Sequence, residues 1–403
     1  IKQPTLVKKL AIHFGGGGAC WEANGALGPV AVTDQCWKIL EGAWQFSVTG
    51  VGVLDLVNGP AKGYTTIVLP DCTGDIFLGD TTLTTSDGSG TVLQQRGYTN
   101  ALAVKAWAME NFPQNLFHFA IVGYSAGALA AMAWSGDLLG DFKYRRATVL
   151  LDSYASHFPP DIEGPTLKRW GGCGAHIFDQ EWRDLCNNGK INVAMVLERD
   201  LKKFPDVAFG TIQGKEDETQ IKFYRGIAQS WGLATHTTLT GPELYAATNE
   251  LFEARQKIHP NFKVYYVDGA GHQFANTPLL GTASSAGMSA PSPPCLPSLL
   301  EWVTEFFAGE PVGDVCYGPA GGEPVAGTTD YCTIGDAISC GTYTQLKWAA
   351  AAWTAAPAGS SSLLLFAGLG VAFVALAVAA GAMVYRRLST PAEQALVEDA
   401  LAE

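Results

Sequence analysis

The sequence predicts an α/β fold in which a mostly parallel β-sheet is covered by helices on both faces. Short β-rich apolar runs alternate with amphipathic helical patterns through the first 308 residues, and this alternation is typical of parallel strands joined by helices. A chain of 403 residues, 47% hydrophobic and 16% charged, also suits one large domain around a buried sheet. The expected strands are 6–14, 65–70, 117–123, 146–152, 206–212 and 262–268. The expected helices are 93–111, 126–136, 191–203, 218–231, 241–258 and 296–308.

A charge-free segment near the C-terminus predicts a transmembrane helix. Residues 363–385 are 23 consecutive uncharged residues, enough to cross the hydrocarbon core at 1.5 Å per residue. Arg386 and Arg387 follow at once, and a basic flank normally stays cytoplasmic. A single-pass type I topology is therefore expected, with residues 386–403 in the cytoplasm. A buried core helix and a GPI signal are weaker alternatives, the latter because polar residues follow the apolar segment.

The residues between the globular part and this helix predict a stalk. Residues 309–362 are rich in Gly, Ala, Pro and Thr, contain three cysteines and show little periodicity. We therefore expect a domain over 1–308, a disulfide-pinned stalk over 309–362, and the domain on the extracellular or luminal side of the membrane.

Cysteine placement supports that location. Nine cysteines stand mostly in Gly/Pro/Ser-rich stretches, as in disulfide-bonded secreted proteins. No CxxC spacing occurs, which disfavours a zinc or iron–sulfur site. The chain starts at Ile1 without Met or an apolar leader, so a processed or missing N-terminal piece is expected. Sequence alone leaves the connectivity open, and the close pairs are Cys20 with Cys36, Cys173 with Cys186, and Cys332 with Cys340.

The charge excludes a class of partner. The net charge is −12, and residues 1–362 carry 24 basic and 34 acidic side chains, 24 − 34 = −10. No Lys/Arg-rich run stands in that part, so nucleic-acid binding is disfavoured. The same charge would repel a strongly acidic polysaccharide.

A serine motif stands where an expected strand meets an expected helix. The strand FHFAIVG runs into Gly123-Tyr124-Ser125-Ala126-Gly127, and a helical pattern follows directly. GxSxG in a strand–turn–helix setting is the nucleophile turn of the α/β-hydrolase fold. Small flanking residues permit the sharp turn, and the helix N-terminus favours developing negative charge. The alternative is a glycine-rich helix start with Ser125 as an N-cap.

A hydroxyl nucleophile needs a base and an acid, which in this fold follow in the order Ser, Asp, His. His272 is the preferred base because it lies in a turn just after a late strand, whereas His13 and His118 lie inside strands. The acid is expected after the strand that ends at residue 212. Asp217 is the preferred acid, with Glu216 its nearest rival and Asp152 an alternative position.

A glycine run follows the first expected strand. In a hydrolase, residues 15–18 would point backbone N–H groups at the tetrahedral oxyanion together with the N–H of Ala126, the residue after the nucleophile. A phosphate-binding loop is the rival interpretation, but the GK[ST] ending is missing. No metal or organic cofactor is expected.

These motifs together resemble the pectin acetylesterase and Notum family of serine carboxylesterases. The resemblance covers roughly residues 7–308. It rests on the Gly-rich turn at 15–20 with Cys36, the PDCTGD segment at 70–75, the GYSAG turn at 123–127 and the DETQI segment at 217–221. It implies an α/β-hydrolase-like fold, a triad of Ser125, Asp217 and His272, and an oxyanion hole from Gly17, Gly18 and Ala126. The sequence departs from the family's motifs at Ala19, Tyr124 and Ala128, and at Gln273-Phe274 after the base.

The resemblance also implies a reaction. The first expectation is removal of O-acetyl groups from a cell-wall or extracellular polysaccharide, a neutral or weakly acidic one as well as pectin. The second is removal of a fatty acyl group from a secreted protein. A different class, an inactive surface binding protein on a hydrolase scaffold, is the third. The segment from Phe158 to Trp182 is interpreted as a polar cap loop because it is rich in Pro, Gly and charge, and a short acyl group is therefore expected.

Overall fold

The computed structural model describes residues 8–20, 51–84, 92–112, 115–289 and 296–315. They all belong to one compact unit, Ile1–Lys347. Most of the expected stalk, the segment 363–385 and the tail lie outside the described residues. Within the described ranges, no helix is long and apolar enough to cross a membrane.

A six-stranded sheet lies at the centre of the described residues, in the order β2-β1-β5-β6-β7-β8, and its strand pairs are parallel. Its strands are β1 (Lys9–Phe14), β2 (Thr65–Leu69), β5 (Leu116–Tyr124), β6 (Tyr144–Asp152), β7 (Ala208–Gly214) and β8 (Phe262–Val267). The helices are α2 (Gly97–Asn111), α3 (Ala126–Asp141), α4 (Glu163–Arg169), α5 (Gln180–Asn187), α6 (Val193–Lys203), α7 (Glu218–Ser230), α8 (Gly241–Ile258) and α9 (Leu299–Ala308). This confirms the expected mostly parallel sheet with helices.

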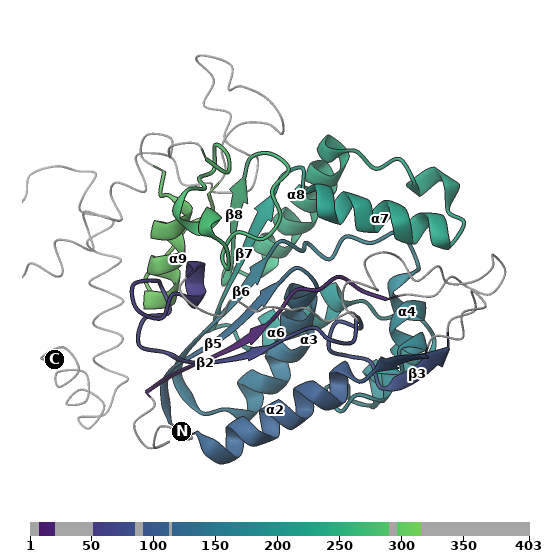
Figure 1. Ribbon diagram of the computed structural model, residues 1–403, viewed down its shortest axis with the longest axis horizontal. Coiled ribbons are helices and arrows are strands. Elements are labelled where there is room, and N and C mark those ends of the chain that lie inside the picture. The colour runs from purple at the N-terminus through teal and green to yellow at the C-terminus, as the bar shows by residue number, and fades with distance from the viewer. Residues whose placement is uncertain (1–7, 21–50, 85–91, 113–114, 290–295, 316–403) are drawn as a thin grey trace, which may run out of the picture. The chain divides into compact units, whose positions relative to one another are not determined.

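Successive residues of each strand bury their side chains on opposite faces of the sheet, as the two-residue period of a strand requires. In β5, Phe119 and Ile121 pack into one apolar cluster with side chains from α2, α3 and α6. Ala120 and Val122 pack into a second cluster with side chains from α9. Figure 1 shows α9 on the side of the sheet away from α2, α3 and α6. Both faces are therefore covered, which explains the near-continuous apolar runs in the sequence.

The order in which strands are added to the sheet switches sides between β1 and β5. The strand after β1 is added on one side, as β2, whereas β6, β7 and β8 are added in turn on the other side of β5. Loops leaving β1 and β5 therefore diverge, and in open parallel sheets this switch point at the carboxyl ends is where ligands bind. The glycine run follows β1 and Ser125 follows β5, so both expected parts of the site lie at the switch point.

The helix expected over 93–111 is shorter than predicted. Its first residues form β4 (Val92–Gln95), which pairs antiparallel with β3 (Thr81–Thr84). Leu93 and Gln95 are buried and alternate with exposed residues, and the Gln95 side chain donates to the carbonyl of Cys20. These residues therefore form a strand with one buried face, and α2 begins only at Gly97.

The segment expected to be a loop before residue 191 also contains the short helices α4 and α5. The Cys173–Cys186 disulfide confirms one expected pair and ties α5 to the turn before it. Cys20 is disulfide-bonded as well, but Cys36, Cys332 and Cys340 lie outside the described residues. Cys72 carries a free thiol. Asp314 and Val315, expected in the stalk, lie along β8. The backbone N–H of Val315 donates to the carbonyl of Val264, and the N–H of Tyr266 donates to the carbonyl of Val315.

Packing between α3 and α6 provides a test of the fold with a control in the same helix. A methyl group on Gly136 would lie 2.2 Å from Oδ1 of the buried Asp200, whereas a methyl group on Gly140 would meet nothing within 4 Å. We expect Gly136→Ala to lower the free energy of unfolding by about 1–3 kcal/mol through overpacking. Gly140→Ala should leave it unchanged or raise it by up to about 1 kcal/mol, because alanine favours helices.

Urea unfolding of the two variants measures both changes as shifts in midpoint at constant slope. Equal stability of Gly136→Ala and Gly140→Ala would contradict the α3–α6 packing.

Candidate active site

The turn that carries Ser125 is tight and strained. Ser125 has φ 54° and ψ −121°, a conformation that residues with a side chain rarely adopt. A methyl group on Gly123 would lie 2.1 Å from the carbonyl oxygen of Gly127, and one on Gly127 would lie 2.1 Å from that of Phe14. Both glycines of GxSxG are therefore required by close backbone contacts. The backbone N–H of Ser125 donates to the carbonyl of Asp152, 2.8 Å away, which fixes the turn to the neighbouring strand.

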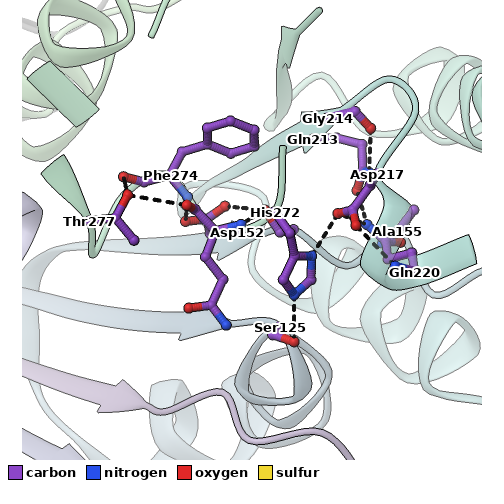
Figure 2. A network of polar contacts seen from close by, with 12 residues as sticks. Ser125, Asp152, Ala155, Gln213, Gly214, Asp217, Gln220, His272, Phe274 and Thr277 are labelled. Carbon is purple, nitrogen blue, oxygen red and sulfur yellow. Dashed lines mark hydrogen bonds and ion pairs between the residues drawn. The ribbon is translucent and has the colours of Figure 1, made fainter. Parts of the chain in front are cut away.

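Ser125, His272 and Asp217 form one chain of hydrogen bonds, although they are far apart in the sequence. The Oγ atom of Ser125 lies 2.8 Å from Nε2 of His272, and Nδ1 of His272 lies 2.7 Å from Oδ2 of Asp217. Figure 2 shows the imidazole between the hydroxyl and the carboxylate. An ionised carboxylate only accepts hydrogen bonds, so Nδ1 carries the proton and Nε2 is left to accept the serine proton. The structure thus brings together the three side chains that the sequence selected.

A second residue fixes Asp217 in place. Asp217 is the N-cap of α7, and its Oδ1 accepts the backbone N–H of Gln220. The Gln220 side-chain amide donates to Oδ2 of Asp217, at 2.8 Å, and to Oε1 of Gln213, while its own oxygen accepts the N–H of Ala155. This role of Gln220 was not predicted from the sequence. The D-x-x-Q capping pattern at a helix start is the signal that points to it.

Asp152, the alternative acid, has another role. Its Oδ2 accepts the backbone N–H groups of Phe274 and Ala275 at 2.8 and 2.6 Å, and Ser153 donates to its Oδ1. These bonds fix the loop that follows His272 rather than the imidazole itself. Burial raises the pKa of Asp152 to about 6 despite the hydrogen bonds. The other rival, Glu216, lines an open groove instead of contacting His272.

Two other histidines are buried in the core, as expected. His13 lies 2.6 Å from the hydroxyl of Tyr124, and burial lowers its pKa to about 3. His118 pairs with the hydroxyl of Tyr64, and burial lowers its pKa to about 4. Both rings are therefore neutral at physiological pH.

The glycine run lies directly beside the nucleophile. A methyl group on Gly16 would lie 2.9 Å from Cβ of Ser125, and Gly18 adopts φ 84°, which favours glycine. Gly18 and Ala126 line the same cavity as Ser125. Gly17 instead packs against Asp71, where an added methyl group would meet the side chain at 3.0 Å. Two of the three expected oxyanion residues therefore face the cavity with the nucleophile.

The cavity beside Ser125 is apolar. Its walls include Ile76 and Leu129 and, from the expected polar cap, Phe158, Leu167 and Trp170. The interpretation of that segment as a polar cap was therefore wrong for these side chains. α4 follows the three- and four-residue period of a helix and turns Glu163, Thr166 and Leu167 towards the cavity, while the charged Lys168 and Arg169 remain exposed. The content of Pro, Gly and charged residues, on which the prediction rested, does not show which side chains of a helix share one face.

The cavity is also small. Its volume is about 40 Å³, well below the roughly 150 Å³ of an apolar cavity that binds benzene. The cavity is therefore of a size that suits a short chain better than a long one.

Comparisons with known proteins add a structural likeness. No family model matches the chain, and no curated protein sequence matches it. Among solved structures, the chain is similar to the Wnt deacylase Notum from Drosophila, with 16% sequence identity, a TM-score of 0.47, and coverage of 70% of this chain and 81% of that one.

The hydrogen bonds of the site predict that removing the charge of Asp217 lowers kcat far more than removing the charge of Asp152. In Asp217→Asn, an amide nitrogen at Oδ2 would face the imidazole and Gln220 side-chain donors, and one at Oδ1 would face the backbone N–H of Gln220. Either the imidazole loses its acceptor or the helix cap that positions the acid loses its hydrogen bond. In Asp152→Asn the amide can keep its oxygen on the loop N–H groups and its nitrogen on Ser153. We expect Asp217→Asn to lower kcat by roughly 10⁴-fold and Asp152→Asn to lower it far less, measured with an activated ester.

Equal losses in the two variants, or a larger loss in Asp152→Asn, would reverse the assignment of the acid.

Proposed function

We propose that this protein hydrolyses carboxylic esters through a serine acyl-enzyme. The observation that carries the proposal is the hydrogen-bonded chain from Ser125 through His272 to the buried Asp217. Ser125 attacks the ester carbonyl while His272 takes its proton, and His272 returns that proton to the leaving alcohol. A water molecule, activated by His272, then releases the acid and restores Ser125. Asp217 orients the imidazole and stabilises its charged form.

The backbone N–H groups of Gly17, Gly18 and Ala126 are the proposed oxyanion hole. The start of α3 supports the assignment of Ala126, because the first N–H groups of a helix have no partner within the helix. Gly18 is supported by its position in the cavity wall with Ser125. Gly17 is assigned on the family resemblance, and its own contact is with Asp71.

The cavity volume supports a short acyl group. Removal of O-acetyl groups from an extracellular polysaccharide remains the first candidate. Removal of a fatty acyl group from a secreted protein is the second, and the apolar walls favour it. The two observations point in different directions. The volume supports short chains, because a fatty acyl chain would have to displace side chains such as Phe158 or Phe223.

An open groove beside the triad supports a large polar leaving group. It offers about 680 Å³ and runs along α7 to Ala270, two residues before the base. Its lining carries both signs of charge, with Glu218, Lys222 and Arg225. Such a surface suits an uncharged saccharide or a polypeptide better than a strongly acidic polymer.

An inactive binding protein is the third candidate. A scaffold that had lost catalysis would have no need for the strained backbone at Ser125 or for the aligned imidazole. Labelling tests this directly. A fluorophosphonate probe should modify Ser125, and Ser125→Ala should abolish labelling while leaving the melting temperature unchanged. Labelling that persists in Ser125→Ala would exclude Ser125 as the nucleophile.

Acyl-chain length tests the proposed substrate class. In a series of nitrophenyl esters from two to sixteen carbons, we expect kcat/KM to be highest at two to four carbons and to fall steeply by eight. The reason is that each added CH₂ beyond the cavity forgoes about 0.8 kcal/mol of burial and displaces packed side chains. A kcat/KM that climbs steadily from two to eight carbons would support the fatty-acyl candidate instead.

We also propose that residues 363–385 hold the protein in a membrane, with the hydrolase domain outside and 386–403 in the cytoplasm. The charge-free segment and its Arg386-Arg387 flank support this topology. Protease added to intact cells should remove the domain and spare a C-terminal tag. Loss of the tag with protection of the domain would reverse the orientation.

A further inference from the structure

One carboxyl group lies in the wall of the otherwise apolar cavity. Glu163, the first residue of α4, lines the same cavity as Ser125 and is partly buried there. Its neighbours in the wall include Ile162, Leu167 and Phe158. A carboxyl group in such surroundings costs free energy unless each of its oxygens finds a partner.

Among the described residues, only one of the two carboxyl oxygens of Glu163 has a hydrogen-bond partner. Oε1 of Glu163 accepts the backbone N–H of Val193 at 2.7 Å, and the structure gives its side chain no other hydrogen bond and no ion pair among the described residues. Burial raises the pKa of Glu163 to about 8. At neutral pH the group is therefore mostly protonated and can both donate and accept a hydrogen bond.

The other polar side chains of the cavity are arranged differently. Thr166 donates to the carbonyl of Ile162, and the indole N–H of Trp170 donates to the carbonyl of Cys20. Ser125 is engaged with His272. The hydroxyl of Tyr154 is the other polar group of the wall without a hydrogen bond among the described residues. Its pKa is raised by burial, next by the charge of Glu163 and then by that of Asp217. The open hydrogen-bonding capacity of the cavity is therefore concentrated at Glu163 and Tyr154.

We propose that the cavity takes a short acyl group bearing a hydroxyl, and that Glu163 is the specificity-determining residue that hydrogen-bonds it. The inference rests on the proposed esterase function and names the substrate class. A bound hydroxyl would satisfy the open carboxyl oxygen, whereas an alkyl group in its place would leave that oxygen unpaired in an apolar wall. Sites that hydrogen-bond a substrate group discriminate strongly against analogues that lack it.

A neutral hydroxyl fits these surroundings better than an ammonium group. The walls around Glu163 are apolar, so a cationic acyl group would lose its hydration to reach a carboxyl that is mostly neutral at pH 7. A hydroxyl carries a much smaller desolvation cost and pairs with either protonation state of the carboxyl.

Matched nitrophenyl esters test the proposal with the full-length protein. The 3-hydroxybutanoate and 3-methylbutanoate esters differ only by hydroxyl and methyl, and 6-hydroxyhexanoate with heptanoate forms a longer pair. We expect wild-type kcat/KM to favour the hydroxyl ester by about tenfold or more in at least one pair. Glu163→Met should bring that ratio to one or below, and Glu163→Gln should retain most of it at pH 7. The ratio compares two substrates in one enzyme, so loss of folded protein cancels.

A pH series provides a readout that needs no destabilised variant. Above about pH 8 the wild-type carboxyl ionises and becomes a stronger acceptor, so the preference for the hydroxyl ester should rise with pH. Tyr154, the other titrating group of the wall, stays neutral in this range because its pKa is raised. His272 and Asp217 act equally on both esters. In Glu163→Gln the ratio should stay flat.

Three outcomes would overturn the proposal: no hydroxyl preference in either wild-type pair, an unchanged preference in Glu163→Met, or a greater rate for the 3-aminobutanoate ester than for 3-hydroxybutanoate. In each case measurable hydrolysis of the plain esters would leave the esterase function standing. Failure to hydrolyse any ester would instead count against the proposed function.

Discussion

The strained turn at Ser125 is the constraint on which the rest of the site depends. Ser125, a residue with a side chain, is held at φ 54° between Gly123 and Gly127, where an added methyl group would lie 2.1 Å from a backbone carbonyl oxygen. The conformation costs on the order of 1–3 kcal/mol, and the packed sheet and α3 maintain it. The turn lifts the hydroxyl above the carboxyl edge of β5, directly beside the glycine run after β1. Nucleophile, proposed oxyanion donors and acyl cavity therefore share one place because of one backbone geometry.

Two buried carboxylates near this turn have different roles, because Asp217 contacts the imidazole and Asp152 contacts the loop that carries it. Asp217 and Asp152 both lie in the interior and both accept several hydrogen bonds. Asp217 accepts one from the imidazole, whereas Asp152 binds the backbone that follows the imidazole. An acid that orients the base and another that fixes the base's own loop hold His272 from two sides. Such pre-organisation is what a proton transfer within about 3 Å requires.

The cavity and the groove make different demands on a substrate. The cavity beside Ser125 is apolar, small and interrupted by Glu163, while the groove along α7 is open and carries both signs of charge. Phe223 lines both spaces. In the proposed reaction, the ester would place a compact acyl group in the cavity and a large polar alcohol towards the groove. This division follows from α7, whose inner side chains close the cavity while its charged side chains face solvent.

The sequence by itself predicted the parallel sheet, the order of its strands along the chain, and the residues Ser125 and His272, and it favoured Asp217 as the acid. It could do so because GxSxG in its strand–turn–helix setting and the alternation of apolar runs are local signals. Only the tertiary structure decided between Asp217 and Asp152, because both follow strands and the choice depends on which carboxylate reaches the ring. It alone also showed that residues near 162–170 form an apolar wall with Glu163 in it. That wall depends on how α4 is rotated against the cavity, and rotation is set by packing between segments distant in sequence, which composition does not encode.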